Sequence, residues 1–257
     1  MTTTIAPEVF LGTARPVRLA ARAEGITKEY GAGATRVVAL DHVDLEVPRG
    51  EFTAIMGPSG SGKSTLLYCM AGLERVTRGH AYIGDVDITA LDDRRLTQLR
   101  RDHIGFVFQA YNLVPTLTAA ENITLPLAIA HRRPDQVWLD SVIDTVGLRD
   151  RLAHRPAELS GGQQQRVAAA RALITKPDIV FADEPSGNLD SRSGAQLLEF
   201  MRQSVRTYGQ TIVMVTHDPI IATYADRVVF LKDGAAVDGM SRPTVDGVLH
   251  RMSTLEG

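Results

Sequence analysis

Short apolar runs that end in polar residues recur along the chain and predict a sheet of buried strands. The runs DIVFADE (178–184), TIVMVTHD (211–218) and DRVVFLKDG (226–234) are almost continuously apolar before their polar ends, as parallel strands buried on both faces are. EFTAIMG (51–57) predicts a shorter strand that leads into a glycine-rich loop, and VVALDHVDLEV (37–47) alternates in part like a half-buried strand. Open parallel sheets bind ligands beyond the carboxyl ends of their strands, so we expect the site there.

Helical patterns separate these strands. STLLYCMAGLE (64–74) predicts a helix that follows the glycine-rich loop and stops near Gly72. Between residues 109 and 160 the chain is more polar, and segments such as RPDQVWLDSVIDTVGL (133–148) predict an inserted helical lobe. We expect a single domain over residues 17–257 whose parts have these approximate limits: a core at 17–109 and 166–235, a helical lobe at 110–165 and a short tail at 236–257, all after a loose N-terminal extension at 1–16.

Composition narrows the class of protein. The chain has 257 residues, of which 44% are hydrophobic, and this is enough for one large domain or a core with an inserted lobe. The formal net charge of −2 argues against a general nucleic-acid binder, so no nucleic-acid partner is expected. The one cysteine, Cys69, excludes an internal disulfide framework, suits a reducing cytoplasm and is predicted to be a small core residue.

The sequence does not predict insertion into a membrane. No apolar run approaches the roughly 18 to 20 residues that a membrane-spanning helix needs. The N-terminus lacks the basic start and long apolar region of a signal peptide. Any membrane contact is therefore expected to be made through a partner protein.

The glycine-rich loop GPSGSGKST fits the pattern G-x-x-x-x-G-K-[ST] of a phosphate-binding loop. Its glycines allow backbone N–H groups to turn inward around phosphate oxygens, and the following helix points its positive end at the same place. Lys63 supplies a charge to the outer phosphates, and the hydroxyl of Ser64 suits Mg²⁺. The predicted nucleotide-binding residues of the loop are Gly57, Pro58, Ser59, Gly60, Ser61, Gly62, Lys63, Ser64 and Thr65.

Polar residues at the ends of two predicted strands are candidates for catalysis. Asp183 is placed to hold a magnesium shell, and Glu184, next along the chain, can polarise an attacking water. The alternative is that both are surface acids, which the phosphate loop upstream argues against. His217 closes the strand TIVMVTHD, where its chemistry alone fits a structural role as well as a catalytic one.

Three further features have little meaning when each is taken alone. Gln109 ends the apolar stretch GFVFQAYN, and Tyr30 in KEYGAG is an aromatic residue able to stack on a base. The stretch LSGGQQQR (159–166) is a second glycine-rich, serine-bearing turn that leads into a helix. From the residues alone, it is a second anion-binding helix start.

Taken together and in this order, these motifs resemble the ATP-binding-cassette (ABC) ATPase family. The phosphate loop, Gln109, LSGGQ, FADEP, SGNLD and VTHD cover almost the whole chain from about Val17 to Gly234. The resemblance implies an α/β fold, with a P-loop NTPase core built on a parallel sheet, an antiparallel β portion on its N-terminal side and an inserted α-helical lobe. It also implies an ATPase that uses ATP and Mg²⁺.

The resemblance explains the second glycine-rich turn. In this family two subunits pack head to tail, and the Leu159–Gln163 turn of one closes over the ATP held by the other. Ser160 and the amides of Gly161 and Gly162 would meet the γ-phosphate, and the helix that starts near Gln163 would add its dipole. A second copy of the chain is therefore an expected partner, in a dimer closed by ATP.

The remaining roles follow from the same resemblance. Tyr30 matches the base-stacking aromatic, and Gln109 matches a magnesium ligand that begins a partner-sensing segment. Asp190 matches the aspartate that links the two sites of the dimer, and His217 matches the histidine that contacts the γ-phosphate and holds the water. The implied catalytic residues are Glu184, His217 and Lys63, and the implied metal ligands are Ser64, Gln109 and Asp183.

Several stretches resemble one branch of the family, which serves macrolide exporters and lipoprotein-release systems. They include IGFVFQAYNLVPTLTAAENITLPL and ADEPSGNLDS, in which Ser186 replaces a frequent threonine. The branch implies a membrane permease as partner, a peripheral location on the cytoplasmic face of the membrane, and export of lipids, lipoproteins, peptides or drugs. A non-translocating ATPase that transmits force to cell-envelope enzymes stays open, and import is disfavoured by the short tail.

One segment after Gln109 is a candidate for contact with the permease. The stretch AYNLVPTLTAAEN (110–122), called the docking segment below, contains the apolar residues Tyr111, Leu113, Val114 and Leu117. Such residues in a cleft would anchor an amphipathic helix. The alternative is that they pack inside the helical lobe.

Overall fold

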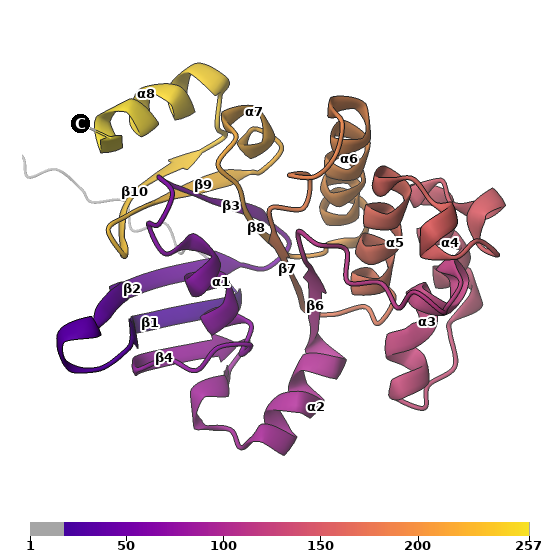
Figure 1. The fold of residues 1–257 in the computed structure, drawn as a ribbon, viewed down its shortest axis with the longest axis horizontal. Coiled ribbons are helices and arrows are strands. Elements are labelled where there is room, and N and C mark those ends of the chain that lie inside the picture. The colour runs from indigo at the N-terminus through magenta and orange to yellow at the C-terminus, as the bar shows by residue number, and fades with distance from the viewer. Residues whose placement is uncertain (1–17, 257) are drawn as a thin grey trace, which may run out of the picture.

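The computed structural model describes residues 18–256, which form two sheets flanked by helices (Figure 1). The predicted N-terminal extension, residues 1–16, lies outside the described residues. None of the helices within residues 18–256 has the length and apolar character needed to cross a membrane.

The larger sheet has six strands in the order β10-β9-β3-β8-β7-β6. All neighbouring pairs are parallel except β9 and β10, which are antiparallel. The strands predicted from the apolar runs are confirmed as β3, β7, β8 and β9. The strands of this sheet are β3 (Phe52–Met56), β6 (Ile104–Val107), β7 (Ile179–Asp183), β8 (Ile212–Val215), β9 (Arg227–Lys232) and β10 (Ala235–Ser241).

The central strands are buried throughout and mostly apolar because both faces of this sheet are covered. Every residue of β3, β7 and β8 is buried. Alternate residues of β7 belong to different apolar clusters: Val180 and Ala182 pack with α5 and α6, and Ile179 and Phe181 pack with α1 and the smaller sheet. The two faces of the sheet are covered, so polar residues can lie at the edge formed by the carboxyl ends of the strands.

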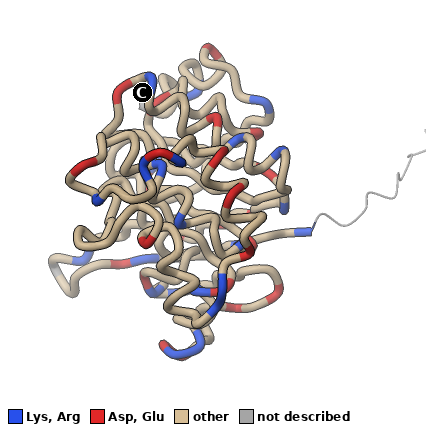
Figure 2. The backbone as a smooth tube through the Cα atoms, turned by 90° about the vertical axis from the view of Figure 1, so that its right-hand side faces the viewer, with Lys and Arg blue, Asp and Glu red and all other residues tan. Residues whose placement is uncertain are grey.

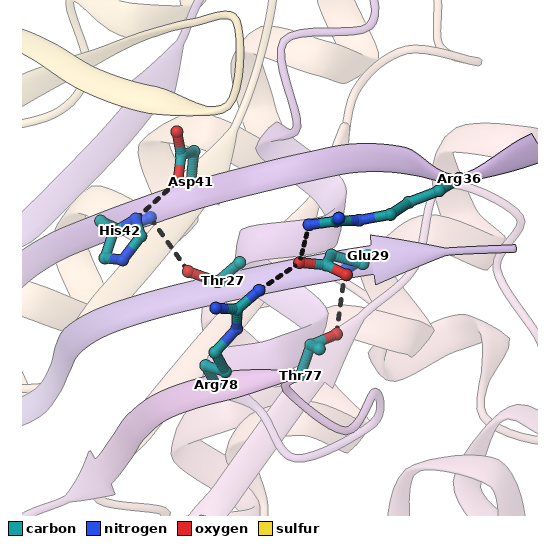
Figure 3. Close-up of polar contacts among 7 residues, drawn as sticks. All are labelled: Thr27, Glu29, Arg36, Asp41, His42, Thr77 and Arg78. Atoms are coloured by element: carbon teal, nitrogen blue, oxygen red, sulfur yellow. Dashed lines mark hydrogen bonds and ion pairs between the residues drawn. The ribbon is translucent and has the colours of Figure 1, made fainter. Parts of the chain in front are cut away.

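The smaller sheet is antiparallel and confirms the predicted β portion on the N-terminal side. Its strand order is β2-β1-β4-β5, formed by β1 (Leu19–Tyr30), β2 (Val37–Pro48), β4 (Arg78–Ile83) and β5 (Val86–Asp87). Glu29 connects several segments of this sheet (Figure 3). Its Oε1 accepts hydrogen bonds from Arg36 at 2.6 Å and from Arg78 at 2.7 Å, and its backbone N–H donates a hydrogen bond to the hydroxyl of Thr77. This fixes the end of β1, which carries Tyr30.

Helix α1 follows the glycine-rich loop and packs one side into the core. Leu66, Leu67 and Met70 are fully buried beside Cys69. Burial raises the pKa of the Cys69 thiol to about 12, so the thiol stays protonated at neutral pH. The prediction of a small core residue is thus confirmed.

The other helices form the lobe and cover the larger sheet. In Figure 1 α3, α4 and α5 lie together on one side of the molecule, with α6 next to α5. The helices are α1 (Lys63–Met70), α2 (Asp93–His103), α3 (Ala119–Ile129), α4 (Gln136–Val146), α5 (Gly161–Leu173), α6 (Ser191–Tyr208), α7 (Pro219–Ala222) and α8 (Val245–Glu256), with single 3₁₀ turns at Gly33–Thr35, Ile88–Ala90, Arg149–Arg151 and Pro156–Glu158.

Two predicted limits of the parts fall inside regular elements. The limit at residue 165 lies within α5, because this helix packs on α3 and α4 in the lobe and on β6 and α6 in the core. The predicted tail contains β10, which pairs with β9, and α8, which packs on α7. The residues of the predicted tail therefore pack against the core.

Charged residues of both signs are mixed on the surface. On the side that Figure 2 shows, Lys and Arg lie among Asp and Glu along the backbone. Ion pairs link many of them, such as Arg49 with Asp178 at 2.9 Å and Lys28 with Glu74 at 2.8 Å. The Arg49–Asp178 pair is partly exposed, and such surface pairs contribute little to stability, whereas Lys28 is only 12% exposed.

Candidate active site

The phosphate loop lies between β3 and α1, and two of its glycines are required by its path. Gly57 has a φ of +152°, and a Cβ there would lie 2.0 Å from the carbonyl oxygen of Leu231. Gly62 has a φ of +95°, and its Cβ would lie 2.4 Å from the carbonyl oxygen of Ala39. Any side chain at either position would clash with the backbone of β9 or β2.

Lys63 is held inside the loop that it belongs to. Its Nζ donates hydrogen bonds to the carbonyl oxygens of Gly57 at 2.9 Å and Pro58 at 2.7 Å. Burial lowers the pKa of Lys63, and the nearby carboxylates of Glu184 and Asp183 oppose that effect. The ammonium group of Lys63 therefore lies near the carboxylates of Asp183 and Glu184.

The rest of the loop offers groups that a phosphate could engage. Ser61 Oγ is buried and has no hydrogen-bond partner among the described residues, whereas Ser59 and Gly60 are exposed. Tyr30 is 40% exposed at the end of β1. Partial burial raises the pKa of Tyr30. A hydrogen bond between the side chains of Tyr30 and Thr65 opposes this rise. The predicted base-stacking residue thus lies next to the loop.

Asp183, at the end of β7, accepts a hydrogen bond on each carboxylate oxygen. Ser64 Oγ donates to Oδ1 at 2.8 Å, and the hydroxyl of Tyr68 donates to Oδ2 at 2.5 Å. Burial and the Asp183 carboxylate raise the pKa of the Tyr68 hydroxyl. Two predicted metal ligands, Ser64 and Asp183, are therefore brought together.

Glu184 and His217 form a pair at the same edge of the sheet. His217 Nδ1 lies 2.8 Å from Glu184 Oε1. The Glu184 N–H donates to the Val215 carbonyl, and the Glu184 carbonyl accepts from Gly187, which holds Glu184 at a φ of +46°. The imidazole is mostly exposed, whereas the Glu184 side chain is 16% exposed and lies close enough to Lys63 of the phosphate loop to affect its pKa.

Gln109 is brought to the segment that follows Glu184. Its Nε2 lies 3.3 Å from the place where a Cβ of Gly187 would be, and its carbonyl oxygen accepts a hydrogen bond from Asn188 Nδ2 at 3.1 Å. Gln109 is exposed to solvent. The structure thus places it between the docking segment and the Asp–Glu pair.

The second glycine-rich turn forms a separate cluster. Ser160 caps α5: Gln163 N–H donates to Ser160 Oγ at 3.3 Å, and Ser160 N–H donates to Gln163 Oε1 at 2.9 Å. A Cβ on Gly162 would lie 2.6 Å from Cβ of Ser193, and one on Gly161 would lie 2.8 Å from the hydroxyl of Tyr111. Within residues 18–256, no hydrogen bond joins this turn to the phosphate loop.

Asp190 caps the neighbouring helix α6 and lies close to that turn in space. Its Oδ1 accepts hydrogen bonds from the N–H groups of Arg192 at 3.1 Å and Ser193 at 3.0 Å. Hydrogen bonding by Ser193 lowers the pKa of Asp190, so the carboxylate is ionised at neutral pH. Asp190 and the turn at Ser160–Gln163 therefore meet through Ser193, which packs on Gly162.

The docking segment is built on one buried amide. Asn122 is 0% exposed, and its Oδ1 accepts from Val114 N–H at 2.8 Å. Its Nδ2 donates to the carbonyl oxygens of Val114, Leu117 and Thr118 at 3.0 to 3.1 Å. Leu113, Val114 and Leu117 are all partly exposed, but of the three Leu113 alone packs against the larger apolar core, which favours the alternative role for Leu113.

Helix α5 is tied to the start of the docking segment. Arg171 donates to the carbonyl oxygens of Asn112 at 2.7 Å and Tyr111 at 3.0 Å, and Gln165 Nε2 donates to that of Phe108 at 3.2 Å. The helix that presents Ser160 and the strand that leads to Gln109 are thus connected by side chains.

Sequence reasoning missed Tyr68 and Asn188. Tyr68 was assigned to the predicted helix with no role, although its spacing of four residues from Ser64 places both on one helix face. Asn188 lies within SGNLD but reaches Gln109 only because the chain turns back at Gly187. No local pattern signals such a contact.

A phosphate loop between a parallel strand and a helix, with an Asp–Glu pair ending another strand of that sheet, defines a P-loop nucleotide hydrolase. Residues 40–187, more than half of the chain, match the family model described as ABC transporter. The chain belongs to this family and is an ATP-binding ATPase, as the resemblance implied.

Relatives agree with this assignment. An ABC transporter ATP-binding protein of Methanocaldococcus jannaschii is 45% identical over 217 residues, which is 82% of this chain and 92% of that protein. The bacitracin export ATP-binding protein BceA of Halalkalibacterium halodurans is 44% identical over 82% of this chain and 85% of its own length. The macrolide export ATP-binding/permease protein MacB of Marinobacter nauticus is 44% identical over 84% of this chain, which spans only 34% of that longer protein.

A solved structure gives the same fold. The dimeric, post-hydrolysis ATP-binding cassette MJ0796 bound to ADP and Pi has a TM-score of 0.79 and 40% identity. The alignment covers 87% of this chain and 99% of the solved chain. The predicted α/β P-loop fold is therefore confirmed.

Proposed function

We propose that this chain is the ATPase subunit of an exporter, which dimerises head to tail and drives a membrane permease from the cytoplasmic face of the membrane. The observation that carries the dimer is the separation of two anion-binding clusters on one chain. The phosphate loop has Lys63, Asp183 and Glu184 around it, whereas the Ser160 turn has Asp190 beside it. Each cluster is half of a site that two chains complete.

The residues present fit Mg²⁺ as a cofactor. Mg²⁺ prefers oxygen ligands, and Ser64 Oγ and Asp183 Oδ1 lie 2.8 Å apart. Ser64 would bind the ion directly, and Asp183 and Gln109 would complete its shell with the phosphates. When bound, the ion neutralises charge that develops on the transferred phosphoryl group.

The hydrolytic step would be carried by Glu184 and His217. Asp183 accepts hydrogen bonds from Ser64 and Tyr68, whereas Glu184 lies near Lys63 of the phosphate loop and has His217 Nδ1 at 2.8 Å. Glu184 would accept a proton from the attacking water, while His217 holds that water and the γ-phosphate in line. Lys63 would exchange its contacts with Gly57 and Pro58 for phosphate oxygens.

The exporter assignment rests on the relatives and on the docking segment. BceA and MacB are named for bacitracin and macrolide export. Val114 and Leu117 are partly exposed apolar residues held in place by Asn122, and the segment is joined to α5 by Arg171. An amphipathic helix of a permease would find rigid apolar anchors there, next to Gln109.

Replacing Leu117 with Glu is expected to abolish co-purification with the cognate permease and its stimulation of ATPase activity. The isolated subunit should keep its thermal unfolding temperature and its ATP affinity, because Leu117 is partly exposed and contributes only its carbonyl to Asn122. Pull-down and ATPase assays with the permease in lipid vesicles measure the effect.

Leu113→Glu is the matched control for this experiment. Leu113 packs against the buried core, so a charge there should destabilise the isolated subunit. If Leu117→Glu also unfolds the subunit, or if it leaves permease binding unchanged, the docking surface must lie elsewhere.

A further inference from the structure

The magnesium aspartate is held from two directions by one face of helix α1. Ser64 and Tyr68 are four residues apart on this helix, and each donates a hydrogen bond to a different oxygen of Asp183, at 2.8 Å and 2.5 Å. Both carboxylate oxygens are thus engaged within the protein itself. The plane of the carboxylate is thereby fixed relative to α1 and the phosphate loop.

The hydroxyls of Ser64 and Tyr68 differ in what they are expected to bind. Ser64 is a proposed ligand of the ion, so its oxygen is shared between Asp183 and the metal. Among the residues that the structure describes, the hydroxyl of Tyr68 hydrogen-bonds to Asp183 alone, on the oxygen that Ser64 does not contact. Its hydrogen bond can therefore orient the carboxylate whether or not the ion is present.

The Tyr68 ring is itself held against the edge of the larger sheet. Its centroid lies 5.8 Å from that of Phe106 on β6, and Phe106 lies 4.2 Å from Phe108. An aromatic ring packed in this way loses little freedom when its hydroxyl binds, so the hydrogen bond costs little conformational entropy. The stack gives Tyr68 a defined position from which to aim its hydroxyl.

We infer that Tyr68 is a positioning residue for magnesium, which sets the orientation of Asp183 and so the affinity of the site for the ion. The inference rests on the magnesium site of the proposed function. Groups that hydrogen-bond a metal-ligating carboxylate typically change metal affinity by about 10- to 100-fold when they are lost. The hydrogen bond of Tyr68 belongs to this kind of contact.

The test is Tyr68→Phe, which removes the hydroxyl and keeps the ring against Phe106. Affinity for a fluorescent ATP analogue is measured with EDTA and across a Mg²⁺ titration. We expect unchanged affinity in EDTA, and a Mg²⁺ concentration for half-maximal binding that rises about 10-fold. At saturating Mg²⁺ the rate of hydrolysis should return close to that of the wild type.

Tyr208→Phe is the matched control, because Tyr208 also hydrogen-bonds through its hydroxyl, to Ser141 at 2.6 Å, and packs on Trp138. It should leave the Mg²⁺ titration unchanged. A double-mutant cycle with Asp183→Asn identifies the route: if Tyr68 acts through Asp183, Tyr68→Phe has no further effect in that background.

Two results would overturn the inference, and one of them would also overturn the proposed magnesium site. A folded Tyr68→Phe variant with a wild-type Mg²⁺ titration overturns the role of Tyr68 alone. A wild-type protein whose nucleotide affinity does not respond to Mg²⁺ overturns the proposed magnesium site together with the role of Tyr68.

Discussion

Replacing Glu184 with Gln is expected to leave ATP binding intact and to slow hydrolysis by about 10²- to 10⁴-fold, the usual cost of losing a general base. The amide keeps the size of the side chain but cannot take a proton from water. Because ATP then persists, two chains should stay closed around it. Size-exclusion chromatography with ATP should show a dimer that is absent with ADP.

The geometry around Glu184 provides the control for this experiment. His217 lies 2.8 Å from Glu184 Oε1 and is proposed to hold the attacking water, so His217→Ala should also lower turnover. Asp226→Asn changes an acid that accepts a hydrogen bond from Phe52 N–H and takes no part in the proposed chemistry. Near-normal turnover of Glu184→Gln would show that another group activates the water.

The second large effect concerns the sharing of sites between chains. Lys63→Ala should weaken nucleotide binding or hydrolysis, since it removes the charge held at the mouth of the loop. Ser160→Arg should retain ATP, because no hydrogen bond within residues 18–256 joins the Ser160 turn to the phosphate loop, yet it should block closure. Both homodimers are therefore expected to be inactive, for different reasons.

Mixing the two variants tests the arrangement directly. In a mixed dimer, one site combines both lesions, and the other combines an intact phosphate loop with an intact Ser160 turn. Substantial ATPase activity in the mixture, measured against each variant alone, supports sharing. An inactive mixture that still forms ATP-dependent dimers would mean that the two sites must act together, and an inactive mixture without dimers would contradict the head-to-tail arrangement.

Four strands of the larger sheet, β3, β7, β8 and β9, could be predicted because their burial leaves a strong local signal, whereas β6 and β10 were not predicted as strands. β3, β7 and β8 are buried at every residue, so their sequences are almost continuously apolar. The limits of the lobe could not be read in the same way. Helix α5 packs on both lobe and core, so its sequence shows no change at residue 165.

Some residues of the candidate site could also be predicted from the sequence, and others could not. Lys63, Asp183, Glu184 and His217 stand beside strand ends, where the topology of a parallel sheet gathers them at one edge. Leu113 was predicted for docking because it is apolar in a loop, but its packing on the core depends on how Asn122 folds that loop. The side-chain contacts made across the fold, such as that of Tyr68 with Asp183, have no signature in one sequence.

The backbone conformation of Glu184 lowers the stability of the fold, although the side chain of this residue is proposed to be needed for activity. A φ of +46° costs a residue with a side chain about 1 to 2 kcal/mol, and glycine avoids most of that cost. Glu184→Gly should therefore melt at a higher temperature than Glu184→Gln, although both lack the base. A search for stability alone would favour glycine here and would remove the proposed base, so mutagenesis that seeks thermostability should leave this position untouched.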